Sequence, residues 1–176
     1  LSLEDKHWKK IKLNEIKSLI KNCLGIRLQF NTSNESGVAN MFIPVKIMAF
    51  NPSPIPIKLK IISKSFKVEP STNLTNNQVW EINEKFKIPE VKTTPYWLLT
   101  EGDLGNYKVE NETLKILPET PNPIKVQFKI SINNTEIPFE VPLTYRITDQ
   151  VDGEVIQNFQ VLPRVTTQLN KKVLLL

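Results

Sequence analysis

Most of this chain alternates between hydrophobic and polar residues with a period of two. The alternation is clearest in residues 124–132, where Ile124, Val126, Phe128 and Ile130 are separated by polar residues. Successive side chains of a strand point to opposite faces, so this pattern predicts a strand with one buried face. Similar alternation, or a short apolar run bounded by turn residues, predicts further strands over 26–30, 41–50, 57–61, 78–88, 107–109, 114–116, 137–147 and 153–162.

The first 25 residues follow a helical period instead. Apolar residues recur three and four positions apart, which predicts an amphipathic helix over residues 3–24 with lysines on its other side. Ser2 and Asp5 resemble a capping box, and Gly25 suits the residue after a helix. The apolar side consists of Trp8, Ile11, Ile16, Leu19, Ile20, Cys23 and Leu24. We expect it to pack on a sheet or a neighbouring domain, since a membrane-surface helix needs a more strongly apolar face.

The proline content supports a fold built from many short strands. Thirteen prolines stand against five glycines, and proline is confined to strand edges, turns and connections. We therefore predict a mainly β protein, an immunoglobulin-like antiparallel β-sandwich preceded by one N-terminal amphipathic helix. The predicted division is a connector helix over residues 1–25 and an accessory sandwich over residues 26–176. With one cysteine, Cys23, an intrachain disulfide is impossible.

The charge pattern argues against two classes of partner. The net charge is +5, but the lysines are scattered and arginine occurs only at positions 27, 146 and 164. Nucleic-acid binders usually gather Lys and Arg on one face, so we expect no nucleic-acid partner. No stretch reaches the ~20 apolar residues of a membrane span. We expect the chain to be a piece of a longer protein, and an extracytoplasmic location, periplasmic or secreted, is favoured.

Candidate catalytic chemistry is sparse. His7 is the single histidine and lies on the predicted surface helix, whereas catalytic triads and zinc sites need histidine at the centre of a fold. Cys23 lies on the apolar side of that helix, where a small core residue is expected rather than a nucleophile. The acidic groups at 101–103 and 149–154 suit turns and do not match a calcium loop. We therefore assign no catalytic residue, metal ligand or cofactor.

The segment 94–107, TPYWLLTEGDLGNY, concentrates aromatic, acidic and glycine residues. Two interpretations compete: the rings fill the core, or they form a stacking platform for a sugar. The first is favoured, because a large ring between strands is usually buried. Under the second, the candidate ligand-binding residues are Tyr96, Trp97, Tyr107, Glu101, Asp103 and Arg146.

Several short motifs in order resemble a known family. They are TPYWL at 94–98, GNY at 105–107, LPETP at 117–121, YRITD at 145–149, GEV at 153–155 and VLPRV at 161–165. This series resembles the non-catalytic C-terminal region of bacterial, Bacteroidetes-type PIG-L/LmbE-like N-acetylglucosaminyl deacetylases. The resemblance covers nearly the whole chain.

The resemblance implies an accessory role. The catalytic domain of that family uses zinc to remove N-acetyl groups from amino sugars, and its hallmark is an Ala-His-Pro-Asp-Asp segment. Nothing in this chain matches that segment, so no catalytic or zinc residue carries over, and zinc is expected only in a preceding catalytic domain. The implied partners are the catalytic domain of the same polypeptide and a glycan. The alternatives are a stand-alone carbohydrate-binding module and a structural or protein-interaction spacer.

Overall fold

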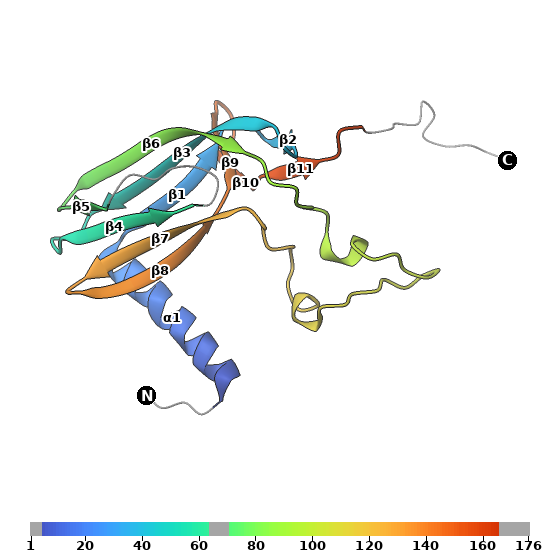
Figure 1. Cartoon of the computed structure of the whole chain (residues 1–176), viewed down its shortest axis with the longest axis horizontal. Coiled ribbons are helices and arrows are strands. Elements are labelled where there is room, and N and C mark those ends of the chain that lie inside the picture. Colours follow the sequence, from blue (N-terminus) through green and yellow to red (C-terminus); the bar gives the residue numbers. More distant parts are fainter. Residues whose placement is uncertain (1–4, 64–70, 166–176) are drawn as a thin grey trace.

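The computed structural model describes residues 5–63 and 71–165 (Figure 1). One α-helix, α1 (Lys6–Leu24), precedes all the strands. The strands are β1 (Arg27–Thr32), β2 (Ser36–Val38), β3 (Phe42–Asn51), β4 (Ile57–Ile62), β5 (Thr72–Leu74), β6 (Gln78–Lys87), β7 (Lys125–Ile132), β8 (Thr135–Pro142), β9 (Thr144–Asp149), β10 (Gly153–Asn158) and β11 (Gln160–Leu162). Two short 3-10 helices, η1 (Tyr96–Leu98) and η2 (Glu112–Leu114), lie between β6 and β7.

The strands form a sandwich. One sheet has the order β10-β9-β1-β3-β6 and the other the order β5-β4-β7-β8, and the two lie as separate layers in Figure 1. Neighbouring strands are antiparallel except for two parallel pairs, β1 with β9 and β2 with β11. The pair β2 and β11 forms a small third sheet. The predicted immunoglobulin-like antiparallel sandwich behind one helix is therefore confirmed, with two parallel pairs.

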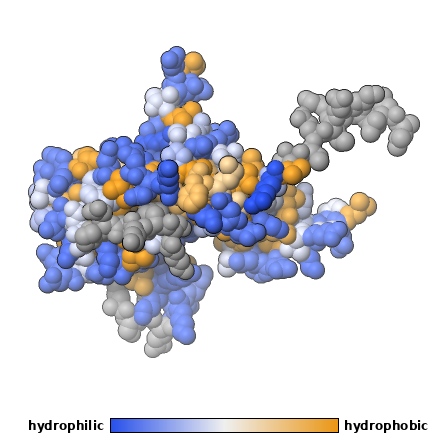
Figure 2. All heavy atoms as spheres, turned by 45° about the horizontal axis from the view of Figure 1, so that its top comes forward, coloured by the Kyte–Doolittle hydropathy of each residue, from blue (hydrophilic) through white to orange (hydrophobic). Residues whose placement is uncertain are grey.

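The core lies between the two large sheets and comes from alternating positions. β3 buries every second residue from Ile43 to Asn51, and β4 does the same from Ile57 to Ile61. Phe128 of β7 and Ile47 of β3 are fully buried. Asn51 is buried too, but its amide donates to the carbonyls of Ile55 and Leu74, so its polar atoms are paired. The outside is a mosaic of hydrophilic and hydrophobic residues (Figure 2).

Two of the predicted strands are each divided into two. Residues 137–147 fall into β8 and β9, and residues 153–162 into β10 and β11. The breaks are at Leu143 and Phe159, which are both buried. The Phe159 N–H donates to the Leu143 carbonyl at 3.4 Å, so the two breaks meet. Each break moves the chain from one sheet to another, which a continuous alternation of apolar residues does not reveal.

Two predicted strands are wrong, and two observed strands were missed. Residues 107–109 are not in a strand, and residues 114–116 form the last residue of the 3-10 helix η2 and the turn after it. The Asn111 carboxamide accepts from the Thr113 N–H at 3.1 Å and starts that turn, which competes with an extended backbone. The short strands β2 and β5 lie outside all the predicted strands.

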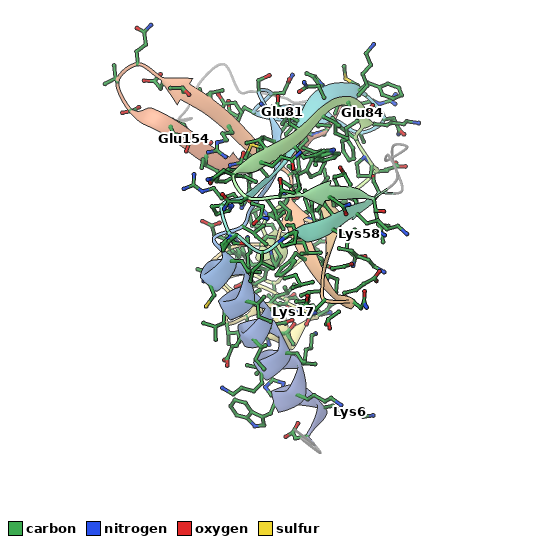
Figure 3. All side chains as sticks on the ribbon, turned by 90° about the vertical axis from the view of Figure 1, so that its left-hand side faces the viewer. Lys6, Lys17, Lys58, Glu81, Glu84 and Glu154 are labelled. Atoms are coloured by element: carbon green, nitrogen blue, oxygen red, sulfur yellow. The ribbon has the colours of Figure 1, made fainter. Side chains whose placement is uncertain are left out.

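The helix begins later than predicted, and its apolar side is exposed. Asp5 is the N-cap, accepting from the backbone N–H groups of His7 and Trp8, while Ser2 lies outside the described residues. Gly25 ends the helix at φ 65°, as predicted. Figures 1 and 3 show α1 projecting from the sheets. None of its residues is buried by the described parts of the chain, and Trp8 is 53% exposed.

The expected packing of this helix on a sheet is therefore wrong for the described residues. Its last turn reaches the sandwich through Leu24, which packs against the core. Cys23, expected in a core, is exposed. The amphipathic pattern fixes which residues share a side of the helix, but not whether anything covers that side.

Candidate functional site

The segment 89–123 connects β6 to β7 and projects from the sandwich as a long loop (Figure 1). Several hydrogen bonds hold it in place. The Tyr96 N–H donates to Thr120 Oγ1 at 2.9 Å, and Tyr96 Oη donates to the Leu117 carbonyl at 3.2 Å. Near its start, Thr93 Oγ1 accepts from the Val161 N–H at 2.9 Å, which joins the loop to β11. The loop is thus held to itself and to the sandwich, although it contains no strand pair with either large sheet.

Three aromatic residues of this loop line one open groove of about 400 Å³. Tyr96 and Trp97 meet edge to face, with ring centroids 4.9 Å apart and an angle of 85° between the planes. Tyr107 comes from the other side of the Asp103–Asn106 turn. The remaining lining residues are Val109 and Lys115. We call this hollow the aromatic groove.

The rings do not fill the core. Tyr107 is 70% exposed, and Tyr96 and Trp97 are half-buried. The interpretation favoured from sequence, that Trp97 and Tyr107 are core residues, is therefore wrong. That interpretation assumed that the rings lie between paired strands, where large rings are usually buried. The segment is instead a projecting loop that links a strand of one sheet to a strand of the other.

The charged candidates lie apart from the rings. Glu101 and Asp103 are exposed residues of the same loop, and neither lines the aromatic groove. Lys115 does line it, and its ammonium pairs with Glu112 at 2.6 Å. Lys115 was not among the residues singled out from the sequence, which predicted a strand over 114–116. Its position directly after η2 is known only from the structure.

Arg146 belongs to a different surface. It lies on β9, where its Nε donates to Glu154 Oε1 of β10 at 2.7 Å. Its side chain lines a polar hollow of about 580 Å³ together with residues of β1 and β3 such as Gln29 and Lys46. The predicted set of six ligand-binding residues is thus divided, and the structure brings together Tyr96, Trp97 and Tyr107.

A second hollow, of about 200 Å³, adjoins the aromatic groove at Trp97. We call it the proline hollow, because prolines form much of its lining. Its residues are Thr93, Pro95, Trp97, Pro118, Glu119, Thr120, Pro121, Asn122, Pro123, Asn158, Phe159 and Gln160. The sequence motif at 117–121 contributes several of them, but their meeting with β10 and β11 required the tertiary fold.

His7 is exposed on α1, with its ring edge-on to Trp8 at 5.8 Å between centroids. No three side chains of His, Cys, Asp or Glu gather into a possible metal site within residues 5–63 and 71–165. No helix in this part of the chain has the length and apolar character needed to cross a membrane.

Comparison with known proteins identifies no family. No family model matches the chain, and no curated protein matches it. Among solved structures, a β-glucosidase from Listeria innocua in complex with isofagomine matches at 11% identity and a TM-score of 0.24. The same enzyme in complex with glucose matches at 9% identity and a TM-score of 0.23. Each match covers 67% of this chain and 16% of the enzyme, and a likeness this distant carries no conclusion about function.

Proposed function

We propose that this chain is a non-catalytic accessory β-sandwich that binds a glycan in the aromatic groove. The observation that carries the proposal is the arrangement of Tyr96, Trp97 and Tyr107, which come from two parts of one loop and line one open hollow. Covering the exposed ring of Tyr107 with a partner is favourable, because apolar surface is then removed from water. Sugars suit such rings, because their C–H faces stack on aromatic surfaces while their hydroxyls bond to phenol and ammonium groups.

The parent protein is proposed to be a PIG-L/LmbE-type sugar deacetylase, on the strength of the ordered motifs. In that setting the sandwich positions the glycan for the zinc-dependent catalytic domain of the same polypeptide. The uncovered apolar side of α1 supports this arrangement. Trp8, Ile16 and Leu19 are exposed along it, and a neighbouring domain would bury them.

A protein-interaction or spacer domain is the second candidate, and α1 is the observation that favours it. Trp8, Ile16 and Leu19 are exposed on the apolar side of this helix, and such a side suits contact with another protein whether or not the chain binds a ligand. Sugar binding in the aromatic groove distinguishes the two candidates, because a domain that acts only as a spacer is not expected to bind sugar.

Tryptophan fluorescence tests the glycan proposal. Replacing Trp8 and Trp80 by Phe leaves Trp97 as the reporter, and we expect its emission to shift on titration with N-acetylglucosamine oligomers or glucan oligomers. In the otherwise unchanged chain, Trp97→Ala and Tyr107→Ala should each weaken binding measured by calorimetry at least tenfold, or about 1.4 kcal/mol. Trp8→Ala is the matched control, since it removes an exposed indole outside the groove.

Two experimental results would contradict the proposal. If Trp97 emission stays unchanged and calorimetry detects no heat of binding with any of the oligomers, glycan binding is excluded and the spacer is favoured. Zinc-dependent release of acetate from N-acetylated amino sugars by the purified chain would show that it is not an accessory domain but an enzyme.

A further inference from the structure

We infer that the binding surface continues from the aromatic groove into the proline hollow, so that the ligand is an oligosaccharide of at least two sugar units. This inference rests on the proposed glycan binding and specifies its ligand. The two hollows share one lining residue, Trp97. A sugar held at Trp97 in the aromatic groove therefore has a second hollow next to it.

The local backbone explains how one short turn serves both hollows. Pro95, Tyr96 and Trp97 are consecutive around the start of η1. Pro95 lines the proline hollow, Tyr96 lines the aromatic groove, and Trp97 lines the two. In a tight turn successive side chains fan out in different directions, so a single 3-10 turn can separate two adjacent subsites.

The proline hollow has the mixed chemistry that a sugar unit requires. Proline rings and Phe159 supply apolar walls. Glu119, Asn158 and Gln160 supply a carboxylate and two amides, which can accept from and donate to hydroxyls. Asn158 Nδ2 lies 3.4 Å from Glu119 Oε2, so two of these groups from distant parts of the chain already face each other.

Both sides of the proline hollow are fixed before any ligand arrives. Asn122 is buried and donates to the Leu143 carbonyl at 2.7 Å, which holds the end of the loop against the core. Thr120 accepts from the Tyr96 N–H at 2.9 Å, which joins the two loop segments that form the walls. A preformed hollow loses less conformational entropy on binding than a mobile one.

The volumes also favour a ligand that occupies both hollows. Small-molecule sites usually enclose ~300–1,000 Å³. The proline hollow, at about 200 Å³, lies below that range and is too small to act as an independent site. As an extension of the 400 Å³ aromatic groove it adds a subsite for one more unit of the same chain.

The experiment compares ligands of increasing length on the intact chain. Calorimetry is run with N-acetylglucosamine, its β-1,4-linked dimer and tetramer, and with glucose, cellobiose and cellotetraose. In whichever series binds, we expect at least a tenfold gain in affinity from monosaccharide to tetrasaccharide. Asn158→Ala should remove most of that gain and leave the affinity for the monosaccharide unchanged, whereas Tyr107→Ala should weaken every member of the series.

Controls separate the possible failures. Gln160→Ala provides a second test of the proline hollow, and Asn83→Ala on the outer face of β6 is a matched amide deletion that should change nothing. Equal affinity for monosaccharide and tetrasaccharide, or a loss of monosaccharide binding in Asn158→Ala, would overturn the extended site and leave glycan binding intact. No binding of any sugar, or binding that survives Trp97→Ala, would overturn both proposals.

Discussion

The carboxamide of Asn122 donates to the main-chain carbonyl of Leu143 at 2.7 Å, in the interior of the protein. The same Asn122 accepts from the Ile124 N–H at 2.9 Å through its Oδ1. These two bonds join the end of the long loop to the point where the chain passes from β8 to β9. Asn122 therefore fixes the loop that carries the candidate binding surface to the core of the sandwich.

Asn122→Ala is expected to destabilise the protein by ~1–3 kcal/mol, because it leaves the buried Leu143 carbonyl and Ile124 N–H without this partner. Urea denaturation followed by circular dichroism measures the loss. Asn14→Ala, an exposed position in the middle of α1, is the control and should leave the free energy of unfolding within about 0.5 kcal/mol. Equal effects of the two substitutions would mean that the buried amide does not anchor the loop.

Gly37→Ala is expected to cost ~1–3 kcal/mol through overpacking. A β-carbon at this position of β2 would collide with Ile88 Cδ1 and approach Phe159 Cζ, and both of these residues are buried. The neighbouring substitution Ser36→Ala serves as the control, since residue 36 already carries a β-carbon. A melting temperature of Gly37→Ala equal to that of the unsubstituted protein would contradict this close approach.

Asp5→Ala is expected to loosen the start of α1 by ~0.5–2 kcal/mol without changing the melting temperature of the sandwich. The substitution removes the acceptor for the His7 and Trp8 N–H groups, and the helix makes few contacts that could transmit the loss. Hydrogen exchange of the α1 amides measures the effect. Asp5→Ser keeps a capping oxygen, so its α1 amides should exchange as slowly as those of the unsubstituted protein. If Asp5→Ala lowers the protection of β1 and β3 amides as much as that of α1 amides, the helix is coupled to the sheets and the prediction is wrong.

Asp149 is expected to contribute a small, pH-dependent stabilisation. The Asp152 and Val151 N–H groups donate to its Oδ1 at 3.0 and 2.7 Å and lower the pKa of its carboxyl below the ordinary value of 3.8. Because the folded pKa is the lower one, the stabilisation is complete above pH 3.8 and is lost as the pH falls through the folded value.

Denaturation curves from neutral pH to below pH 3.8 test this. In Asp149→Asn the acid-dependent fall in stability should be shallower than in the unsubstituted protein. Glu101→Gln, at an exposed loop carboxyl, is the comparison and should leave the curve unchanged. A steeper fall in Asp149→Asn would reverse the sign of the effect and disprove the assignment.

The strands and the candidate binding loop could be predicted to different extents. Alternation in residues 26–30, 57–61 and 124–132 is a local property, and β1, β4 and β7 are found there. The divisions at Leu143 and Phe159 could not be predicted, because these residues continue the apolar pattern while the chain changes sheets. The rings of Tyr96, Trp97 and Tyr107 were recognised as a group, but their exposure depended on the loop projecting from the sandwich.

The sequence by itself determined the fold class, the helix and the position of most strands, because period, proline content and glycine caps act through neighbouring residues. It also concentrated the aromatic residues in one loop. Only the tertiary structure decided that α1 lies uncovered, that Arg146 lies apart from the rings and that Trp97 stands between two hollows. These outcomes depend on contacts between segments far apart in the chain, such as Thr93 with Val161 and Asn122 with Leu143. Local patterns carry no information on such contacts.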